Sequence, residues 1–284
     1  MIVQIALPLI LAFIMFTLGL GLRGADFLQV FRYPKAFTIG LLNQLVVLPV
    51  CAFALAKGFS LSPEFAVGLM ILSFCPGGVT SNILAKTANA NTPLSISLTA
   101  CTSLISIVTV PLLVALTANH FMGANAPPVD IAKLGLTMFC ITAVPVLLGM
   151  LVTARAPQLV ERIAKGFTRA GIILFVLLVI AALTKNRVIF FANIDTLAPV
   201  MIILSLGMLA IGFLTAKRAG LDKNDATTIA LETGIQNGVL AIAVGALISA
   251  PDSGALPPIT VPAAVYSISM YITAIPLVLW RRRH

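Results

Sequence analysis

The sequence is poor in charged residues and in the side chains that build most metal and redox sites. Only 10% of its 284 residues are charged, against about 25% in a typical soluble domain. It contains two histidines and four cysteines, and each cysteine stands alone inside an apolar stretch, with no CxxC pair. We therefore expect the cysteines to be small packing residues, and we expect neither a transition metal nor an organic cofactor.

Hydrophobic residues make up 60% of the chain, and its mean hydropathy is +1.09. A helix needs about 20 apolar residues to cross a bilayer core about 30 Å thick. The sequence therefore predicts an all-α polytopic membrane protein with about nine transmembrane helices. The expected spans cover approximately residues 2–22, 34–57, 64–87, 93–118, 131–153, 167–184, 196–216, 225–250 and 258–280. The connections are too short for a soluble domain, so residues 1–284 are predicted to form a single membrane unit.

Basic residues are distributed unevenly between the two sides of this arrangement. Fourteen of the eighteen lie on one side: Arg23, Arg32, Lys35, Lys86, Arg155, Arg162, Lys165, Arg169, Lys217, Arg218, Lys223, Arg281, Arg282 and Arg283. The positive-inside rule then predicts an external N-terminus and a cytoplasmic C-terminus. A net charge of +9 placed in this way does not indicate nucleic-acid binding. The start of the chain lacks a basic n-region and a cleavage pattern, so the first span is predicted to be retained.

Glu232 is the one acidic side chain in the middle of a hydrophobic stretch. An ionisable group at membrane depth costs roughly 2.5–3.5 kcal/mol on insertion scales, so it indicates a partner such as an ion, a substrate or a polar helix. Gly234 and Gly238 weaken the helix on either side of Gln236 and Asn237, which frees backbone carbonyls beside three oxygen-bearing side chains. No paired acids, Ser/His pair or HExxH motif lies near Glu232, so the sequence does not indicate an enzyme.

Two predicted spans are interrupted in the same way, and they lie in opposite halves of the chain. The third contains Pro76 followed by Gly77 and Gly78, and the eighth contains Gly234 and Gly238. Proline removes a backbone donor and glycine adds freedom, so both sequences predict a break at membrane depth. The two spans run in opposite directions in the predicted topology. Paired interrupted helices of this kind are typical of inverted-repeat secondary transporters, whose site lies at the midplane.

Polar oxygens near the breaks predict an alkali-ion site. Ser95 and Thr99 are four residues apart, so their hydroxyls share one helical face. With Ser81, Asn82 and Glu232 they supply neutral and anionic oxygens, which suit a small hard cation better than a transition metal. A second cluster would combine Gln44 and Gln236 with the backbone carbonyls of Glu232, Thr233 and Ile235. The alternative is that these polar side chains only join helices by hydrogen bonds, and for Gln44 alone the two interpretations are equally weighted.

The two interrupted segments resemble a known family. Residues 75–82 (CPGGVTSN) and 232–237 (ETGIQN) resemble the two crossover motifs of the bile acid:sodium symporter family, and Gln44, Ser95 and Thr99 also match. The resemblance covers nearly the whole chain. It implies a core of six helices, approximately 34–118 and 196–280, and a panel of three, approximately 1–22 and 131–184. It also implies two sodium sites, formed by Ser81, Asn82, Ser95, Thr99 and Glu232 and by Gln44, Glu232, Thr233, Ile235 and Gln236.

The chain departs from the family pattern at two places. Bacterial members have ten spans, whereas this chain begins at what resembles their second span. The last span also has no His or Asn in residues 265–271, where some relatives that transport bile acids have them. The resemblance implies a multi-pass protein of the plasma membrane, which in bacteria is the inner membrane. The substrate would be an organic anion, either bile-acid-like or a smaller carboxylate.

Helix dipoles suggest where an anion would bind. Half-helices that start near Val79 and Ile235 would direct positive N-termini into the crossing. We expect the substrate to contact Thr80, Asn82, Asn237 and Ser267. The predicted mechanism is sodium-coupled symport by alternating access, with the lipid bilayer as the surroundings. The alternative is a proton-coupled transporter of the same fold, in which Glu232 would titrate. The sequence predicts no oligomeric state.

Overall fold

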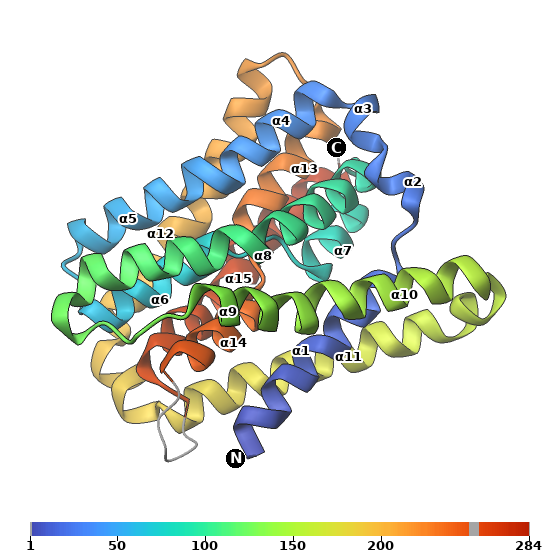
Figure 1. The fold of residues 1–284 in the computed structure, drawn as a ribbon. Coiled ribbons are helices and arrows are strands. Elements are labelled where there is room, and N and C mark those ends of the chain that lie inside the picture. The colour runs from blue at the N-terminus through green and yellow to red at the C-terminus, as the bar shows by residue number, and fades with distance from the viewer. Residues whose placement is uncertain (1, 250–255, 284) are drawn as a thin grey trace.

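The computed structural model describes residues 2–249 and 256–283, and all regular structure in these ranges is helical (Figure 1). Residues 1, 250–255 and 284 lie outside the described ranges, and with them the first residue of the predicted panel, the end of the predicted eighth span and a short part of the predicted core. The first two expected spans correspond to α1 (Ile2–Leu20) and to the continuous run α4 (Pro34–Leu42), η1 (Asn43–Val47) and α5 (Leu48–Gly58). Short helices α2 (Gly24–Phe27) and α3 (Gln29–Arg32) connect them.

Within the described residues, seven helices are long and apolar enough to cross a membrane, or eight if one bent pair counts as a single span. The apolar part of α1 that meets the same composition test, Ala6–Leu20, is shorter. An all-α polytopic membrane protein is therefore confirmed, while the count of nine stays a prediction. The other long helices are α8 (Thr92–Met122), α11 (Pro157–Lys185), α12 (Arg187–Arg218) and α15 (Val261–Arg283), with short turns η2 (Gly123–Asn125) and η4 (Pro258–Thr260).

Two spans carry a π-helical turn just before a proline. The first is η1, which precedes Pro49, and the second is η3 (Phe139–Ala143), which lies between α9 (Ile131–Met138) and α10 (Val144–Arg155) and precedes Pro145. A proline inside a helix removes one i to i−4 hydrogen bond, and a wider turn accommodates that loss. The first π-turn contains Gln44 and holds its side chain in the interior, at 5% exposure.

The two predicted breaks are present, and the broken helices cross. Helices α6 (Pro63–Phe74) and α7 (Val79–Thr87) meet at a bend of 60°. On the other side, α13 (Lys223–Gly234) and α14 (Gly238–Ser249) are separated by an extended turn at Ile235. Helix α7 packs against α13 and α6 packs against α14. The Asn237 amide donates a hydrogen bond of 2.9 Å to the Pro76 carbonyl, so the two breaks are in direct contact.

The second half-helix begins later than the sequence suggested. We expected it to start near Ile235, whereas α14 begins at Gly238. Ile235 is extended, with φ −117° and ψ 114°. The Asn237 side-chain oxygen accepts a hydrogen bond from the Leu240 amide at 3.0 Å. Asn237 is therefore the N-cap of α14, a position that asparagine favours strongly.

Helices α1, α10 and α11 form a layer along one side of the molecule (Figure 1). A side chain at Gly149 would collide with the backbone of α1 at Phe16, and one at Gly19 would collide with the backbone of α10 at Val146. Small residues of this kind allow two membrane helices to approach closely. The α12, α13 and α15 helices pack together elsewhere, as do α6 and α8. The layer of α1, α10 and α11 contains most of the residues predicted for the panel, and the other helices contain most of those predicted for the core. The division into panel and core stays a prediction.

Hydrogen bonds between side chains join several interhelical connections at one end of the molecule. Arg281, near the end of α15, donates from Nη2 to Asn224 Oδ1 at 2.7 Å. Asn91, just before α8, donates from Nδ2 to Asp225 Oδ1 at the same distance. Figure 1 likewise shows the C-terminus near α13 and α7. The C-terminus and the α7–α8 and α12–α13 connections therefore share one end, where the sequence analysis placed basic residues.

A candidate ion and anion site at the helix crossing

The Glu232 carboxylate lies in the last turn of α13 and is 4% exposed. Its Oε1 atom accepts a hydrogen bond from Ser95 Oγ at 2.5 Å, and its Oε2 atom accepts one from Thr99 Oγ1 at 2.8 Å. Ser95 and Thr99 are one turn apart on α8, so one helical face provides both hydroxyls. These partners are neutral groups with lone pairs of their own, so they solvate the carboxylate without neutralising its charge.

Asn82 and Ser81 complete the first predicted cluster. The Asn82 Oδ1 atom lies 2.8 Å from Ser95 Oγ and 3.3 Å from Thr99 Oγ1. Ser81 is fully buried, and its Oγ atom donates to the Gly78 carbonyl at 2.7 Å and also interacts with the Glu232 carboxylate. All five side chains of the first predicted sodium site therefore lie together, and their role as ligands stays a prediction.

Gly77 provides the space at the centre of this cluster. A Cβ atom on Gly77 would lie 2.6 Å from Glu232 Oε2, 3.2 Å from Ser81 Oγ and 3.4 Å from Thr99 Oγ1. Three oxygens from three helices thus surround the position that a Cβ atom of residue 77 would occupy. Glycine, which has no side chain, leaves this position empty. From the sequence, Gly77 was expected only to add backbone freedom, and this role was not predicted. The donor set, one carboxylate with neutral oxygens, fits a small alkali ion.

Three members of the second predicted cluster lie together: Gln44, Gln236 and the Thr233 carbonyl. Gln44 Nε2 donates to Gln236 Oε1 at 2.6 Å and to the Cys75 carbonyl at 2.8 Å. Gln236 Nε2 donates to the Thr233 carbonyl at 2.8 Å. The Thr233 hydroxyl instead donates to the carbonyls of Ile229 and Met208, away from the glutamines, so only its main chain faces the cluster. The two glutamines therefore join the π-turn of α4–α5 to both breaks.

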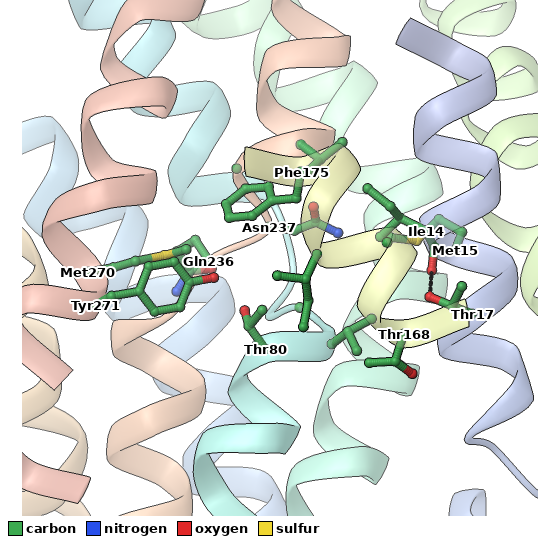
Figure 2. Close-up of a pocket in the computed structure, with 16 residues that line it drawn as sticks. Ile14, Met15, Thr17, Thr80, Thr168, Phe175, Gln236, Asn237, Met270 and Tyr271 are labelled. Carbon is green, nitrogen blue, oxygen red and sulfur yellow. Dashed lines mark hydrogen bonds between the residues drawn. The ribbon is translucent and has the colours of Figure 1, made fainter. Parts of the chain in front are cut away.

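A cavity of about 40 Å³ lies beside the crossing (Figure 2). Its floor is formed by the N-termini of α7 and α14, with Gly78, Val79 and Thr80 from one and Asn237, Gly238 and Val239 from the other. The first amides of each helix have no intrahelical partner and carry partial positive charge. Two helix N-termini meeting at one cavity make a site suited to a small anion.

The four predicted substrate contacts separate into two groups. Thr80 and Asn237 line the cavity. Asn82 belongs to the ion cluster, since its oxygen lies 2.8 Å from Ser95 Oγ. The Ser267 hydroxyl donates to the Ala263 carbonyl at 2.7 Å and packs against Gly238, at the start of α14. All four assignments stay predictions, and the geometry favours Thr80 and Asn237 as direct contacts.

Side chains from α1, α11 and α15 form the remaining walls, and the sequence analysis did not identify them. They include Ile14, Met15, Thr168, Phe175, Met270 and Tyr271 (Figure 2). These helices are apolar over most of their length, so no sequence pattern separates a residue that faces the cavity from one that faces lipid. The packing of α1 and α11 against the crossing determines which of their residues line the cavity.

Comparisons with known proteins identify a family and several relatives of this chain. The model of the Sodium Bile acid symporter family matches residues 8–193. A probable chloroplastic sodium/metabolite cotransporter of rice (Oryza sativa subsp. japonica) is 31% identical over 96% of this chain, which spans 63% of the rice protein. An uncharacterized sodium-dependent transporter of Bacillus subtilis is 30% identical over 92% of this chain and 78% of its own length. The human ileal sodium/bile acid cotransporter is 30% identical over 87% of this chain and 70% of its own length. The matched family and these relatives are transporters and not enzymes.

Proposed function

The chain belongs to the sodium bile acid symporter family, and from this membership we propose that it is a sodium-coupled secondary active symporter of a small organic anion. The observation that carries the proposal is the buried Glu232 carboxylate, held at the crossing by the Ser95 and Thr99 hydroxyls. A carboxylate at this depth is costly unless a cation accompanies it. Sodium is the cation that the neighbouring neutral oxygens suit.

Glu232 couples the two ion clusters to the anion cavity. One sodium ion would contact Ser81, Asn82, Ser95, Thr99 and Glu232, and the other Gln44, Gln236 and the carbonyls of the unwound turn at Glu232, Thr233 and Ile235. Both ions would fix the turns that precede α7 and α14. Sodium therefore stabilises the conformation in which two helix N-termini face the anion, and this differential stabilisation is the coupling.

Two sodium ions with one monovalent anion would carry one net positive charge across the membrane. Moving that charge contributes about 2.3 kcal/mol per 100 mV, in addition to the sodium gradient. The anion cavity lies between α1 and α11 on one side and α7, α14 and α15 on the other. We assign α1, α10 and α11 to the panel and the crossing helices to the core, so a rocking motion between them would open the cavity to alternate sides.

The cavity size favours a small carboxylate. A volume of about 40 Å³ holds only a few water molecules, since one needs roughly 10–15 Å³. Sites for larger ligands typically measure about 300–1,000 Å³. One relative is a sodium/metabolite cotransporter and another a sodium/bile acid cotransporter, and the narrow cavity favours a substrate of metabolite size.

Sodium, but not potassium, is expected to stabilise the purified protein against thermal unfolding. A ligand that binds only the folded state at about a hundred times its Kd adds about 2.7 kcal/mol to the free energy of unfolding. The measurement is a thermal-unfolding series in sodium, potassium and choline chlorides at matched ionic strength and constant pH. Equal stabilisation by all three salts would exclude sodium coupling, and uptake that depends on pH but not on sodium would establish the proton-coupled alternative.

The C-terminus is expected to lie in the cytoplasm and the N-terminus outside, in the plasma membrane of a bacterium. The reason is the positive-inside rule applied to the basic residues that gather with Arg281 at one end. A reporter fused to the C-terminus should be active only in its cytoplasmic form. As a control, the same reporter inserted in the opposite connection near Lys133 should be active only in its external form. Activity with the reverse pattern would contradict the proposed topology.

A further inference from the structure

A second cavity, of about 200 Å³, adjoins the anion cavity between α7, α11 and α15. It is open to the outside of the molecule, since its lining residues Ile83, Ile172 and Val176 are 37%, 39% and 46% exposed. The two cavities share four lining residues, Thr80, Ile172, Phe175 and Tyr271. The side chains of these residues are therefore the partition between them. Beyond the partition, the second cavity is lined by Ile83, Leu84 and Val176, which are all apolar.

The largest part of this partition is an aromatic pair that joins the two groups of helices. Phe175 lies on α11 and Tyr271 on α15, and their ring centroids are 6.3 Å apart at an interplanar angle of 74°. The Tyr271 hydroxyl also interacts with the Thr80 side chain, at the N-terminus of α7. Figure 2 shows the Phe175 ring beside Asn237 and the Tyr271 ring beside Met270 and Gln236. An edge-to-face pair is a weak contact, so it can separate when α11 moves relative to α15.

The cavities on either side of the pair differ in chemistry. On one side, two helix N-termini, the Thr80 hydroxyl and Asn237 suit a carboxylate. On the other side, the hydroxyls of Thr80 and Tyr271 are the polar groups among the lining side chains, they interact with each other, and the rest of the lining is hydrocarbon or aromatic. A substrate with a carboxylate head and an apolar body would match both cavities, provided that the body passes the two rings.

We propose that Phe175 and Tyr271 are a specificity-determining pair, which sets how large an apolar body can extend from a carboxylate at the crossing into the second cavity. This inference rests on the proposed function, since it needs an anion at the helix N-termini. The Ile172 and Thr80 side chains are smaller than the Phe175 ring, so their truncation would open less space between the two cavities. The Phe175 ring therefore controls the size of the opening between them. Removal of the Phe175 ring would merge the two cavities without touching either ion cluster.

The test uses straight-chain monocarboxylates from acetate to decanoate as probes, with binding to the purified protein in sodium measured by calorimetry. For the wild type, we expect the affinity to rise about fourfold for each methylene that enters the second cavity, and to stop rising at a defined chain length. Phe175→Ala should move that limit to longer chains and retain the sodium requirement. Phe175→Leu, which keeps more volume, should move it less.

Two matched variants isolate the effect of the ring. Tyr271→Phe retains the ring and should retain the limit, while losing the contact with Thr80. Phe191→Ala makes the same truncation on α12, where the side chain is 71% exposed, and should behave as the wild type. An unchanged limit in both Phe175 variants would overturn the proposal, and so would the failure of every probe to bind. Sodium-dependent stabilisation without any carboxylate, measured on the same samples, tests the proposed function separately.

Discussion

Replacing Glu232 with glutamine is expected to reduce sodium-driven uptake to background. The carboxylate is buried and is proposed to belong to both sodium sites, so its charge offsets both cations. Glutamine keeps the shape and one oxygen, but it loses that charge. Removing one partner from a buried ion pair typically costs about 3–5 kcal/mol, which is more than about a hundredfold in sodium affinity. The measurement is uptake of labelled substrate into vesicles with an imposed sodium gradient.

Thr99→Ala provides the graded comparison for Glu232→Gln. It removes one neutral oxygen, whose hydroxyl donates to Glu232 Oε2 at 2.8 Å. Loss of one such hydrogen bond costs about 0.5–1.5 kcal/mol, so the sodium concentration for half-maximal uptake should rise by a few-fold to about tenfold. A folded, membrane-inserted Glu232→Gln protein with unchanged sodium dependence would show that Glu232 only joins helices, and the proposed function would fail.

The polar centre of the site was predictable because short sequence segments contain the residues that form it. Pro76 with Gly77 marks one break, and Glu232 with Gly234 marks the other. A buried charge needs oxygen or cationic partners, and Ser95 and Thr99 offered hydroxyls at a spacing of one helical turn. These inferences use residue type and helical periodicity, and the hydrogen bonds to Glu232 agree with them.

The cavity walls were not predictable, because they depend on how separate helices pack. Phe175 and Met15 lie on helices that are apolar on most faces, and hydrophobicity alone does not distinguish a lipid-facing side chain from one that faces a cavity. The start of α14 was misplaced for a different reason. A new helix was expected near Ile235, but the capping preference of Asn237, which sets its start at Gly238, was not taken into account.

Gly77→Ala is expected to weaken sodium binding strongly, because its added methyl group would enter the proposed first sodium site. The new Cβ atom would lie 2.6 Å from Glu232 Oε2, so the carboxylate or the break must move. Overpacking of this kind typically costs about 1–3 kcal/mol, and a displaced carboxylate would lower sodium affinity by about fivefold to more than a hundredfold. Thermal unfolding of the purified variant in a sodium titration measures this loss without requiring the substrate.

The neighbouring glycine separates this steric effect from a general intolerance of alanine at the break. At Gly78 the nearest atom to an added Cβ is Thr80 Oγ1 at 3.7 Å, an ordinary contact. Gly78→Ala should therefore keep its sodium-dependent stabilisation, although it changes the wall of the anion cavity. Gly207→Ala, where an added Cβ has nothing within 4 Å, should match the wild type in both sodium response and uptake. If Gly77→Ala binds sodium as tightly as Gly78→Ala, the ion does not lie among Glu232, Ser81 and Thr99, and the first sodium site must be elsewhere.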